Sequence, residues 1–494
     1  MKQLIIIATI LACVTLLILT GSPIMAQTVN DSLWVTDGSV YAIAISGNTI
    51  YIGGMFDVVE PVSGQGGIAR HNIAAIDAST GKPTSWNPGT DGPVYTIAVS
   101  GSTVYVGGSF GNIGGDLGNV PPQERNNIAA FDATTGEATN WNPGTDDPVL
   151  ALAISGSTIY AGGEFQAIGG IYGSGEWQER SGFAAFNSTT GNPTSWNPST
   201  AAYVYALAIS GSSIYVVGTF SDMGGQTRYG IAALDLGSGN ATSWNPDVAG
   251  DVHCIAVSGS TIYVGGAFGE IGGQERNNIA AIDATTGEAT NWNPGTDSDV
   301  FQLAISDSII YAGGGFVAIG GYFGSVPEEE RNCIAAFSAT TGYATSWNPG
   351  PDAAVLALAF ADSIVYVGGD FDNIAGSGHS FFAGIYTAID TLPPPVLASI
   401  YGRVYSDTAR TCDTTNSGIS GWIVKIEGSG MLPRYAITDA SGQYNFANLA
   451  PGTYSISAQR KDGIAETCPN GNYVVAYDSL NSIGGLNFGE QMVQ

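Results

Sequence analysis

One sequence pattern recurs seven times along this chain of 494 residues. The first copy reads VYAIAISGNTIYIGGMF, and successive copies begin 54, 55, 55, 48, 48 and 55 residues further on. The copies begin at Val40, Val94, Val149, Val204, Val252, Val300 and Val355. A repeat of about 40–50 residues is one supersecondary unit that cannot bury its apolar face alone, so neighbouring copies must pack together. The spacing therefore predicts a stacked or ring-shaped repeat protein.

Each repeat has the composition of four short strands. The first strand is rich in β-branched and apolar residues, and a Ser-Gly-Ser-Thr turn leads into the second. A third strand such as NNIAAFD follows, then the turn ATTG and a segment that ends in Trp-Asn-Pro. Glycine recurs every few residues, which disfavours helix. The sequence predicts an all-β fold, a seven-bladed β-propeller.

The tryptophan at the end of the repeat indicates how the ring closes. Six repeats have one, at Trp86, Trp141, Trp196, Trp244, Trp292 and Trp347, whereas the seventh stops at Asp390 without one. Trp34 precedes the first repeat by six residues. We therefore expect the N-terminal strand to supply the fourth strand of the last blade, which leaves no exposed sheet edge.

Residues 1–26 have the features of a secretory signal peptide: Lys2, an apolar run from Leu4 to Leu19, and a cleavage site after Ala26. An uncleaved membrane anchor is the alternative. We expect a mature chain that begins at Gln27, has no membrane span, and is secreted or held at the cell surface.

The remaining chain divides into residues 27–390 for the propeller, 391–397 for a proline-rich linker, and 398–494 for a small domain. In this domain apolar and polar residues alternate with the period of two that half-buried strands need. In an oxidising compartment a small domain of this kind is stabilised by a covalent cross-link, so we predict a disulfide between Cys412 and Cys468. Cys254 and Cys333 are expected to be buried thiols.

Segments such as Ala75–Gly81 (AIDASTG) and Ala130–Gly136 (AFDATTG), each followed by a tryptophan, resemble the tryptophan-docking motif of quinoprotein-like propellers and the delta-sixty repeats of secreted bacterial propellers. The sequence departs from the quinoprotein pattern by one extra residue between Gly and Trp, and by seven blades where those dehydrogenases usually have eight. It also lacks their vicinal cysteine pair, so no redox cofactor is expected.

The C-terminal segments Gly418–Gly421, Thr438–Tyr444 and Leu449–Tyr454 resemble the prealbumin-like β-sandwiches called carboxypeptidase-regulatory-like or Cna B-type domains. That resemblance implies a spacer or attachment module. Some relatives bind calcium, and Asp407 and Asp413 leave this open here, although the full acidic loop is missing. No other cofactor is expected.

The charge excludes one class of partner. The chain has 42 acidic and 14 basic side chains, a formal charge of −28. Nucleic acids and anionic membranes are bound through clustered Lys and Arg, so neither is an expected ligand.

Two repeated sets of polar residues could be functional or structural. Arginines at the start of the third strand recur in six repeats, which favours a structural role in binding loop carbonyls. Five aspartates stand three residues before an innermost strand and would line one mouth of the channel, where they could gather a cation or cap turns: Asp37, Asp91, Asp146, Asp297 and Asp352.

The 55-residue repeats insert about seven residues between the second and third strands, on the same face as these aspartates. Binding surfaces are commonly built on such loops. Tyr172, Trp177, Tyr322 and Phe323 are the candidate contact residues, with loop packing as the alternative.

Enzyme signatures are missing: three scattered histidines form no zinc pair, and neither a nucleophile elbow nor a Cys-x-x-Cys is present. The sequence therefore favours a non-enzymatic binding or structural protein that engages a protein or glycan ligand. The alternative is an extracellular propeller enzyme, either a polysaccharide hydrolase or lyase or a quinone-dependent oxidoreductase.

Overall fold

The computed structural model describes residues 27–387, apart from 199–201 and 307, and residues 398–406, 417–428, 434–449, 452–458, 464–468, 473–477 and 488–492. The chain divides into two compact units, one ending at residue 388 and the other beginning at 389. The predicted signal peptide and the linker at 391–397 lie outside the described residues. In the described part, we find no helix with the length and apolarity needed to cross a membrane.

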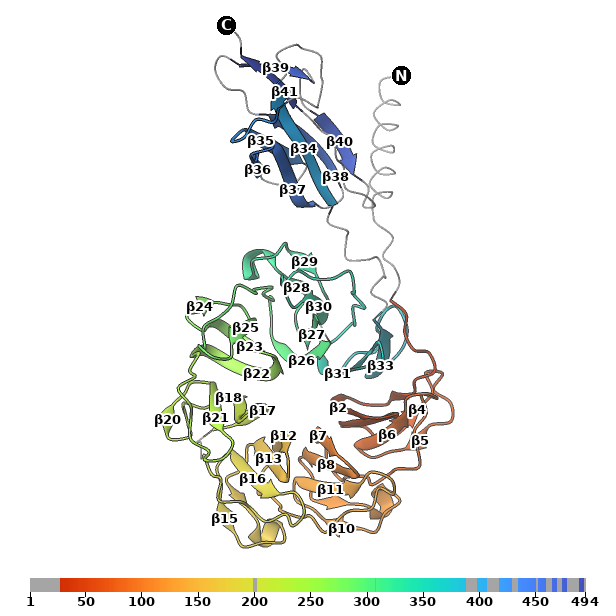
Figure 1. Cartoon of the computed structure of the whole chain (residues 1–494). Helices are drawn as coiled ribbons and strands as arrows, with labels where there is room; N and C mark the ends of the chain where they lie inside the picture. The colour runs from red at the N-terminus through yellow and green to blue at the C-terminus, as the bar shows by residue number, and fades with distance from the viewer. Residues whose placement is uncertain are drawn as a thin grey trace, which may run out of the picture. The chain divides into compact units, whose positions relative to one another are not determined.

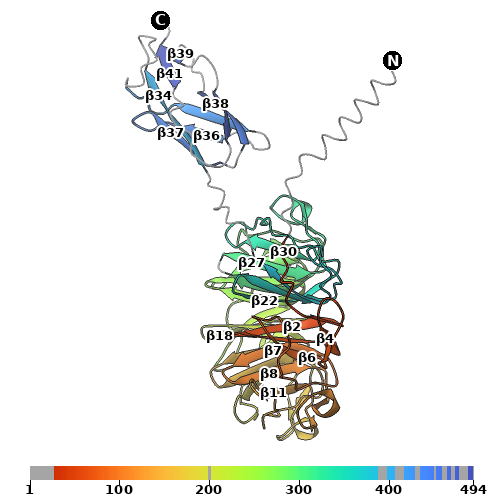
Figure 2. The same ribbon diagram turned by 90° about the vertical axis from the view of Figure 1, so that its right-hand side faces the viewer.

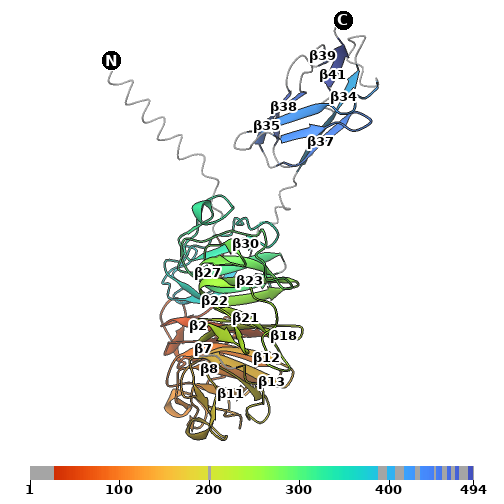
Figure 3. The same ribbon diagram turned by 90° about the vertical axis from the view of Figure 1, so that its left-hand side faces the viewer.

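The first unit is the predicted seven-bladed propeller (Figure 1). Each blade is an antiparallel sheet of three main strands, ordered from the channel outward, and Figures 2 and 3 show the disc from its two edges. The blades are β2 (Val40–Ser46), β3 (Thr49–Gly54) and β6 (Ile73–Asp77); β7 (Val94–Ser100), β8 (Thr103–Gly108) and β11 (Ile128–Asp132); β12 (Val149–Ser155), β13 (Thr158–Gly163) and β16 (Phe183–Asn187); β17 (Val204–Ser210), β18 (Ser213–Gly218) and β21 (Ile231–Asp235); β22 (Val248–Ser258), β23 (Thr261–Ile271) and β25 (Ile279–Asp283); β26 (Val300–Ser306), β27 (Ile309–Gly314) and β30 (Ile334–Ser338); β31 (Val355–Ala361), β32 (Ile364–Gly369) and β33 (Phe382–Tyr386).

The predicted fourth strand of each blade is present only as a short paired segment. In the first six blades a single antiparallel bridge joins it to the third strand, as between Ile76 and Pro83. The turn between the two is built by the repeated aspartate, since Oδ1 of Asp77 accepts hydrogen bonds from the backbone N–H groups of Ser79 and Thr80. The aspartate at the end of the third strand therefore caps this turn.

The seventh blade takes its fourth strand from the other end of the chain, as predicted. Val29 forms the bridge with Ile385 of β33. The backbone N–H of Asn30 donates to the carbonyl of Gly384 at 2.8 Å, and that of Tyr386 donates to the carbonyl of Thr28 at 3.0 Å. The N-terminal segment therefore closes the ring.

The side chain that fills the seam is Leu33 and not Trp34. Leu33 is 1% exposed and belongs to a cluster that includes Tyr366 and Phe382 of the last blade and Val40 of the first. Trp34 is half-buried and packs against the edge of this cluster. The prediction that the strand carrying Trp34 completes the last blade is confirmed, and the segment that follows this tryptophan lacks the Asn-Pro-Gly of the repeats.

A close approach repeats at the blade interfaces and also at the seam. A Cβ on Gly53 would lie 2.4 Å from Cγ1 of Val94 in the next blade, so only glycine fits there. Gly368 of the last blade faces Val40 in the same way, at 2.7 Å. The seam is therefore packed like the other interfaces.

Each of the six tryptophans that end a repeat docks on the blade that follows its own. Trp141 lies edge-on to Tyr105 and Phe186, with ring centroids 5.1 and 6.1 Å away, and its Nε1–H donates to the carbonyl of Asn187 at 2.9 Å. Equivalent indole bonds are made by Trp86, Trp196, Trp244, Trp292 and Trp347. These bonds explain why the tryptophan recurs.

A small ribbon follows the second strand in most blades, and the sequence interpretation did not separate it. The ribbons are β1 (Val35–Thr36), β4 (Val58–Glu60) and β5 (Ile68–Ala69); β9 (Asn112–Ile113) and β10 (Gln123–Glu124); β14 (Ala167–Ile168) and β15 (Gln178–Glu179); β19 (Asp222–Met223) and β20 (Gln226–Thr227); β24 (Gln274–Glu275) on the end of β23; and β28 (Ala318–Ile319) and β29 (Glu329–Glu330). Short 3₁₀ helices extend three of them: η1 (Gly115–Leu117), η2 (Gly170–Tyr172) and η3 (Gly321–Phe323).

The second unit is a β-sandwich, as predicted. Its two sheets have the orders β37-β34-β41-β39 and β36-β35-β38-β40. Trp422, Phe446 and Ile456 lie in its buried core. The strands are β34 (Ala398–Ser406), β35 (Ile423–Gly428), β36 (Arg434–Ile437), β37 (Gln443–Leu449), β38 (Gly452–Ala458), β39 (Ile464–Cys468), β40 (Tyr473–Tyr477) and β41 (Phe488–Met492).

Candidate functional site

The propeller has two different faces, which follow from strand order. The tight hairpins between first and second strands and the turns after third strands lie on one face, called the hairpin face here. The ribbons, the 3₁₀ helices and the connections between blades lie on the other, called the loop face. Both candidate sites indicated by the sequence are on the loop face.

The innermost strand of every blade carries a β-bulge at the residue that follows the first valine of the repeat, next to the loop face. The register shifts between Val40 and Ala42 in the first blade, and at the matching place in the other six. A bulge adds an unpaired residue and re-aims its side chain. The seven bulged residues form a ring that we call the collar: Tyr41, Tyr95, Leu150, Tyr205, His253, Phe301 and Leu356.

The collar lines a cavity of about 300 Å³ in the central channel. Five of its seven side chains are aromatic and several touch. The rings of Tyr41 and Tyr95 are 5.7 Å apart, His253 stacks on Phe301 at 5.7 Å, and Tyr205 lies 5.9 Å from His253. All seven are half-buried. The sequence interpretation missed the collar. Its members all occupy one position, directly after the first valine of each repeat.

Carboxylates lie beside the collar. Burial, followed by the neighbouring Tyr41 and the carboxylate of Glu164, raises the pKa of Tyr95. Burial also raises the pKa of Tyr205, and among the smaller influences are the carboxylates of Asp251 and Glu164. Among the described residues that line the cavity, none is Lys or Arg. The charged side chains that act on the collar tyrosines are therefore acidic.

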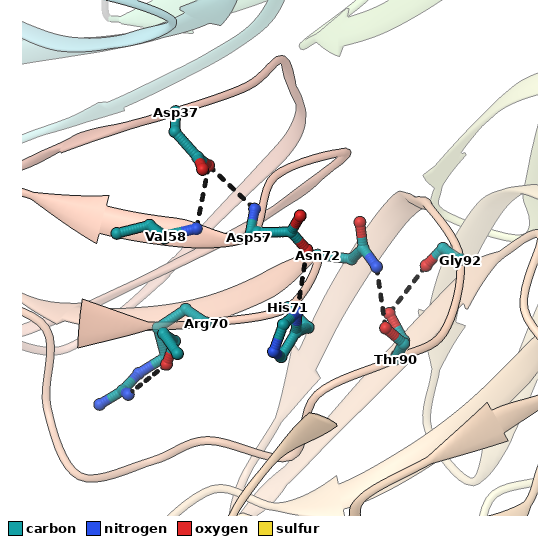
Figure 4. Close-up of polar contacts among 9 residues, drawn as sticks. Asp37, Asp57, Val58, Arg70, His71, Asn72, Thr90 and Gly92 are labelled. Carbon is teal, nitrogen blue, oxygen red and sulfur yellow. Dashed lines mark hydrogen bonds and ion pairs between the residues drawn. The ribbon is translucent and has the colours of Figure 1, made fainter. Parts of the chain in front are cut away.

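The five predicted channel-mouth aspartates each bind the backbone of their own blade. Oδ1 of Asp37 accepts from the N–H groups of Asp57 and Val58, both at 2.9 Å (Figure 4). The same pair of bonds is made by Asp91, Asp146, Asp297 and Asp352. Asp37 and Asp91 also line one shallow pocket with Met55. These contacts give the carboxylates the turn-capping role that was the alternative to cation binding.

Acid should therefore weaken the propeller. Burial opposes ionisation of Asp91 and Asp352, but hydrogen bonds, chiefly from Asn112 and Asn373, outweigh it and hold both pKa values below the usual range. Because the folded pKa lies below the unfolded value of about 3.9, this stabilisation is complete above that pH and is lost as the pH falls through the folded value. We expect a flat melting temperature from pH 8 to about 5 and a steep decline below about 4, measured by circular dichroism. A melting temperature at pH 3 equal to that at pH 7 would contradict this.

The four predicted aromatic contact residues separate into two loops. Tyr172 and Trp177 belong to the third blade, and Tyr322 and Phe323 to the sixth. The ribbons that carry them, at β15 and β29, lie on opposite sides of the ring (Figure 1). Tyr322 is 91% exposed and Trp177 60% exposed, whereas Tyr172 and Phe323 are half-buried. Ile171, which matches Tyr322 in its loop, is 82% exposed and was missed.

These loops are held firmly. The carbonyl of Tyr172 accepts a hydrogen bond from Nδ2 of Asn126 at 3.0 Å, and the carbonyl of Phe323 accepts one from Asn277 at 3.0 Å. Since Asn126 belongs to the preceding blade, each bond joins two blades. In each loop the half-buried residue, Tyr172 or Phe323, therefore anchors the loop through its carbonyl. The exposed residue before it, Ile171 or Tyr322, is presented to solvent.

The repeated arginines have the predicted structural role. In Arg125, Nη1 donates to the carbonyl of Glu124 at 2.8 Å and Nη2 to that of Thr139 at 3.0 Å. Arg70, Arg180, Arg228, Arg276 and Arg331 make the same two bonds. Figure 4 shows Arg70 beside His71, whose Nδ1 lies 2.9 Å from Oδ1 of Asp57.

Cys254 and Cys333 are free and buried, as expected. The predicted Cys412–Cys468 disulfide and the calcium positions Asp407 and Asp413 fall outside what the structure describes, since Cys412 and both aspartates are in undescribed segments and the side chain of Cys468 is not described. Within the described ranges, no three His, Cys, Asp or Glu side chains are grouped so as to hold a metal ion.

The fold and its repeated tryptophans define a β-propeller protein joined to a β-sandwich. Residues 19–294 match the family model PQQ_2, described as outer membrane protein assembly factor BamB. This match spans more than half of the chain, so the chain belongs to that family. Residues 398–482 match the SdrD B-like domain.

Two solved structures are similar to this chain. The computationally designed Ika8 protein has a TM-score of 0.43 and 16% identity, with 72% of this chain and 98% of that chain covered. The WD40 β-propeller domain of Doa1 has a TM-score of 0.45 and 10% identity, with 74% and 98% covered. No curated protein matches the sequence significantly.

Proposed function

We propose that the chain is a non-enzymatic binding protein, secreted or held at the cell surface, whose loop face engages another protein. One observation carries this proposal. Among the described residues of the propeller, nine of the eleven exposed large apolar side chains are on the loop face: Met55, Val62, Ile68, Ile171, Trp177, Tyr203, Tyr229, Val317 and Tyr322. The other two, Tyr343 and Tyr386, follow third strands. Such one-sided exposure is typical of an interaction surface.

The placement of the two aromatic loops favours a large ligand. Trp177 and Tyr322 lie on opposite sides of the ring, so a partner that contacts both must extend across the face (Figure 1). Because the loops are held by inter-blade hydrogen bonds, little ordering cost opposes binding. A folded protein surface can meet both loops at once, whereas a single sugar-binding platform would need its aromatics close together. A protein partner is therefore favoured over a glycan.

The location outside the cytoplasm is supported by the domains. The propeller family is described by an outer membrane protein assembly factor, and the sandwich family by the SdrD B-like domain. Residues 1–26 supply the predicted export signal. In this proposal the sandwich is a spacer or attachment module, and the domain limits are 27–390 for the propeller and 398–494 for the sandwich.

The proposal is tested by removing the exposed aromatics together. The wild-type chain and the Trp177→Ala/Tyr322→Ala variant are immobilised in parallel, and the proteins that they retain from the producing cells are quantified by mass spectrometry. We expect a partner held by the wild type to fall by about tenfold or more in the variant, as for truncated hot-spot aromatics. Tyr343→Ala, which removes an exposed tyrosine from the hairpin face, should retain it fully.

Three outcomes would overturn the proposal. Equal capture by all three proteins would mean that the loop face is not the binding surface. Turnover in a parallel screen of polysaccharides would favour the enzyme alternative, and selective retention on a glycan array would replace the protein partner by a glycan.

A further inference from the structure

The collar is an aromatic site that structural packing does not fully explain. Its seven side chains are pushed into the channel by bulges, yet they leave a cavity of about 300 Å³ between them. The cavity is open to the channel and not sealed inside the protein, so it can be reached from the loop face. The space left is therefore available to a small group.

The chemistry of the collar favours a positive charge. The faces of Tyr and Phe rings carry negative potential and attract cations. Glu164 follows Gly163, which pairs with Val149 beside the collar residue Leu150, and Asp251 is two residues before the collar residue His253, so both carboxylates stand next to the collar. The chain as a whole carries a formal charge of −28, so nothing in the overall field opposes a cation.

The geometry also distinguishes between cations. Two neighbouring ring pairs of the collar are in contact, tilted at 39° for Tyr41 and Tyr95 and stacked at 24° for His253 and Phe301, so a cation meets the ring faces that these contacts leave uncovered. A planar guanidinium stacks on such faces and loses less hydration than a compact ammonium. Arginine therefore fits the site better than lysine.

We propose that the collar receives one arginine side chain of the protein that docks on the loop face. The guanidinium enters the channel mouth past Glu164 and Asp251 and lies among Tyr95, Tyr205 and the neighbouring rings. This inference rests on the proposed function for the source of the arginine, since the collar opens on the same face as Trp177 and Tyr322.

The experiment measures binding of short peptides to the full chain. The probes are fluorescein-labelled Gly-Ser peptides with a single central arginine, citrulline or lysine, and the readout is anisotropy at low salt. Citrulline has the shape of arginine without the charge. We expect the arginine peptide to bind at least tenfold more tightly than the citrulline peptide, with lysine between them. Equal binding of arginine and citrulline would overturn the proposal.

Matched variants locate the site. Tyr95→Leu/Tyr205→Leu removes two ring faces, and the fold should accept it because Leu150 and Leu356 already occupy this position in two blades. We expect arginine affinity to fall about fivefold or more, Tyr95→Phe/Tyr205→Phe to keep it, and Glu164→Gln to lower it and weaken its salt dependence. Wild-type affinity in the double leucine variant, with an unchanged melting temperature, would overturn the proposal.

A further comparison separates this inference from the proposed function. The Trp177→Ala/Tyr322→Ala variant should bind the arginine peptide normally, because neither residue lines the collar. If the peptide binds through the collar but no partner depends on the loops, the proposed function fails and the cation site remains. If partner capture depends on the loops but arginine and citrulline bind equally, only the collar inference fails.

Discussion

A chain that lacks residues 27–38 should lose the cooperative unfolding transition of the propeller. This deletion removes the partner of β33, and with it the two backbone hydrogen bonds between the N-terminal segment and Gly384 and Tyr386. It also removes Val29, Leu33 and Val35, which are all buried. Burial of three such side chains contributes about 5–9 kcal/mol together. A domain of ordinary stability has about 5–15 kcal/mol in total, so the deleted chain should be largely unfolded or aggregated.

The measurement is calorimetry of the full chain and of the chain deleted for residues 27–38. The deleted form should show no propeller transition, while the sandwich, as a separate compact unit, should keep its own. Leu33→Ala tests the seam by a smaller change and should cost about 2–5 kcal/mol. A propeller transition unchanged by the deletion would contradict closure by the N-terminal strand.

A permuted chain provides the matched control. In the first six blades a short turn joins the third strand to the bridging segment, as Asp132–Glu137 does in the second blade. Tyr386 and Thr28 already make the backbone bond that Asp132 and Glu137 make. Residues 28–38 can therefore be moved to follow Tyr386 through a copy of the four residues 133–136. The permutant contains the same contacts with local connectivity, and it should regain the cooperative transition. Failure of an otherwise soluble permutant to fold would indicate that the N-terminal segment acts in another way.

The spacing of the repeats was sufficient to predict the ring, because every blade is built from the same strands, turns and contacts between blades. The tryptophans, the arginines and the turn aspartates recur since each makes the same bond in its blade, as Trp141 does with the carbonyl of Asn187. Repetition reveals which residues are structural. It could not reveal the depth of Trp34, which lies in a segment that resembles the repeat only in part.

Sites built between repeats were harder to predict. The collar takes one residue from each blade, and its residues differ in type, so it shows no pattern within any one copy. Tyr172 and Tyr322 were grouped because both are loop aromatics, but the ring places their blades far apart. Tyr172 and Phe323 are half-buried, and their carbonyls accept hydrogen bonds from Asn126 and Asn277 of the preceding blades, contacts between repeats that composition alone does not indicate.

Replacing Trp141 by alanine should remove a large part of the stability of the propeller. Its ring is 2% exposed and packs edge-on to Tyr105 and Phe186 between two blades. Loss of a buried tryptophan ring typically costs about 3–5 kcal/mol. The carbonyl of Asn187 would also lose its donor. We expect the midpoint of guanidinium unfolding to fall sharply for the whole propeller, since a closed ring cannot relax one interface alone.

Two controls separate packing from hydrogen bonding. Trp141→Phe keeps an aromatic ring but removes the Nε1–H, so it should cost less, about 1–3 kcal/mol for an unpaired carbonyl. Trp34→Ala removes a tryptophan that is only half-buried at the seam, and it should cost less than Trp141→Ala. Equal losses for Trp34→Ala and Trp141→Ala would mean that Trp34 does carry the docking role at the seam. In that case Leu33 would not be the side chain that fills the closing interface, and Leu33→Ala should then be nearly neutral.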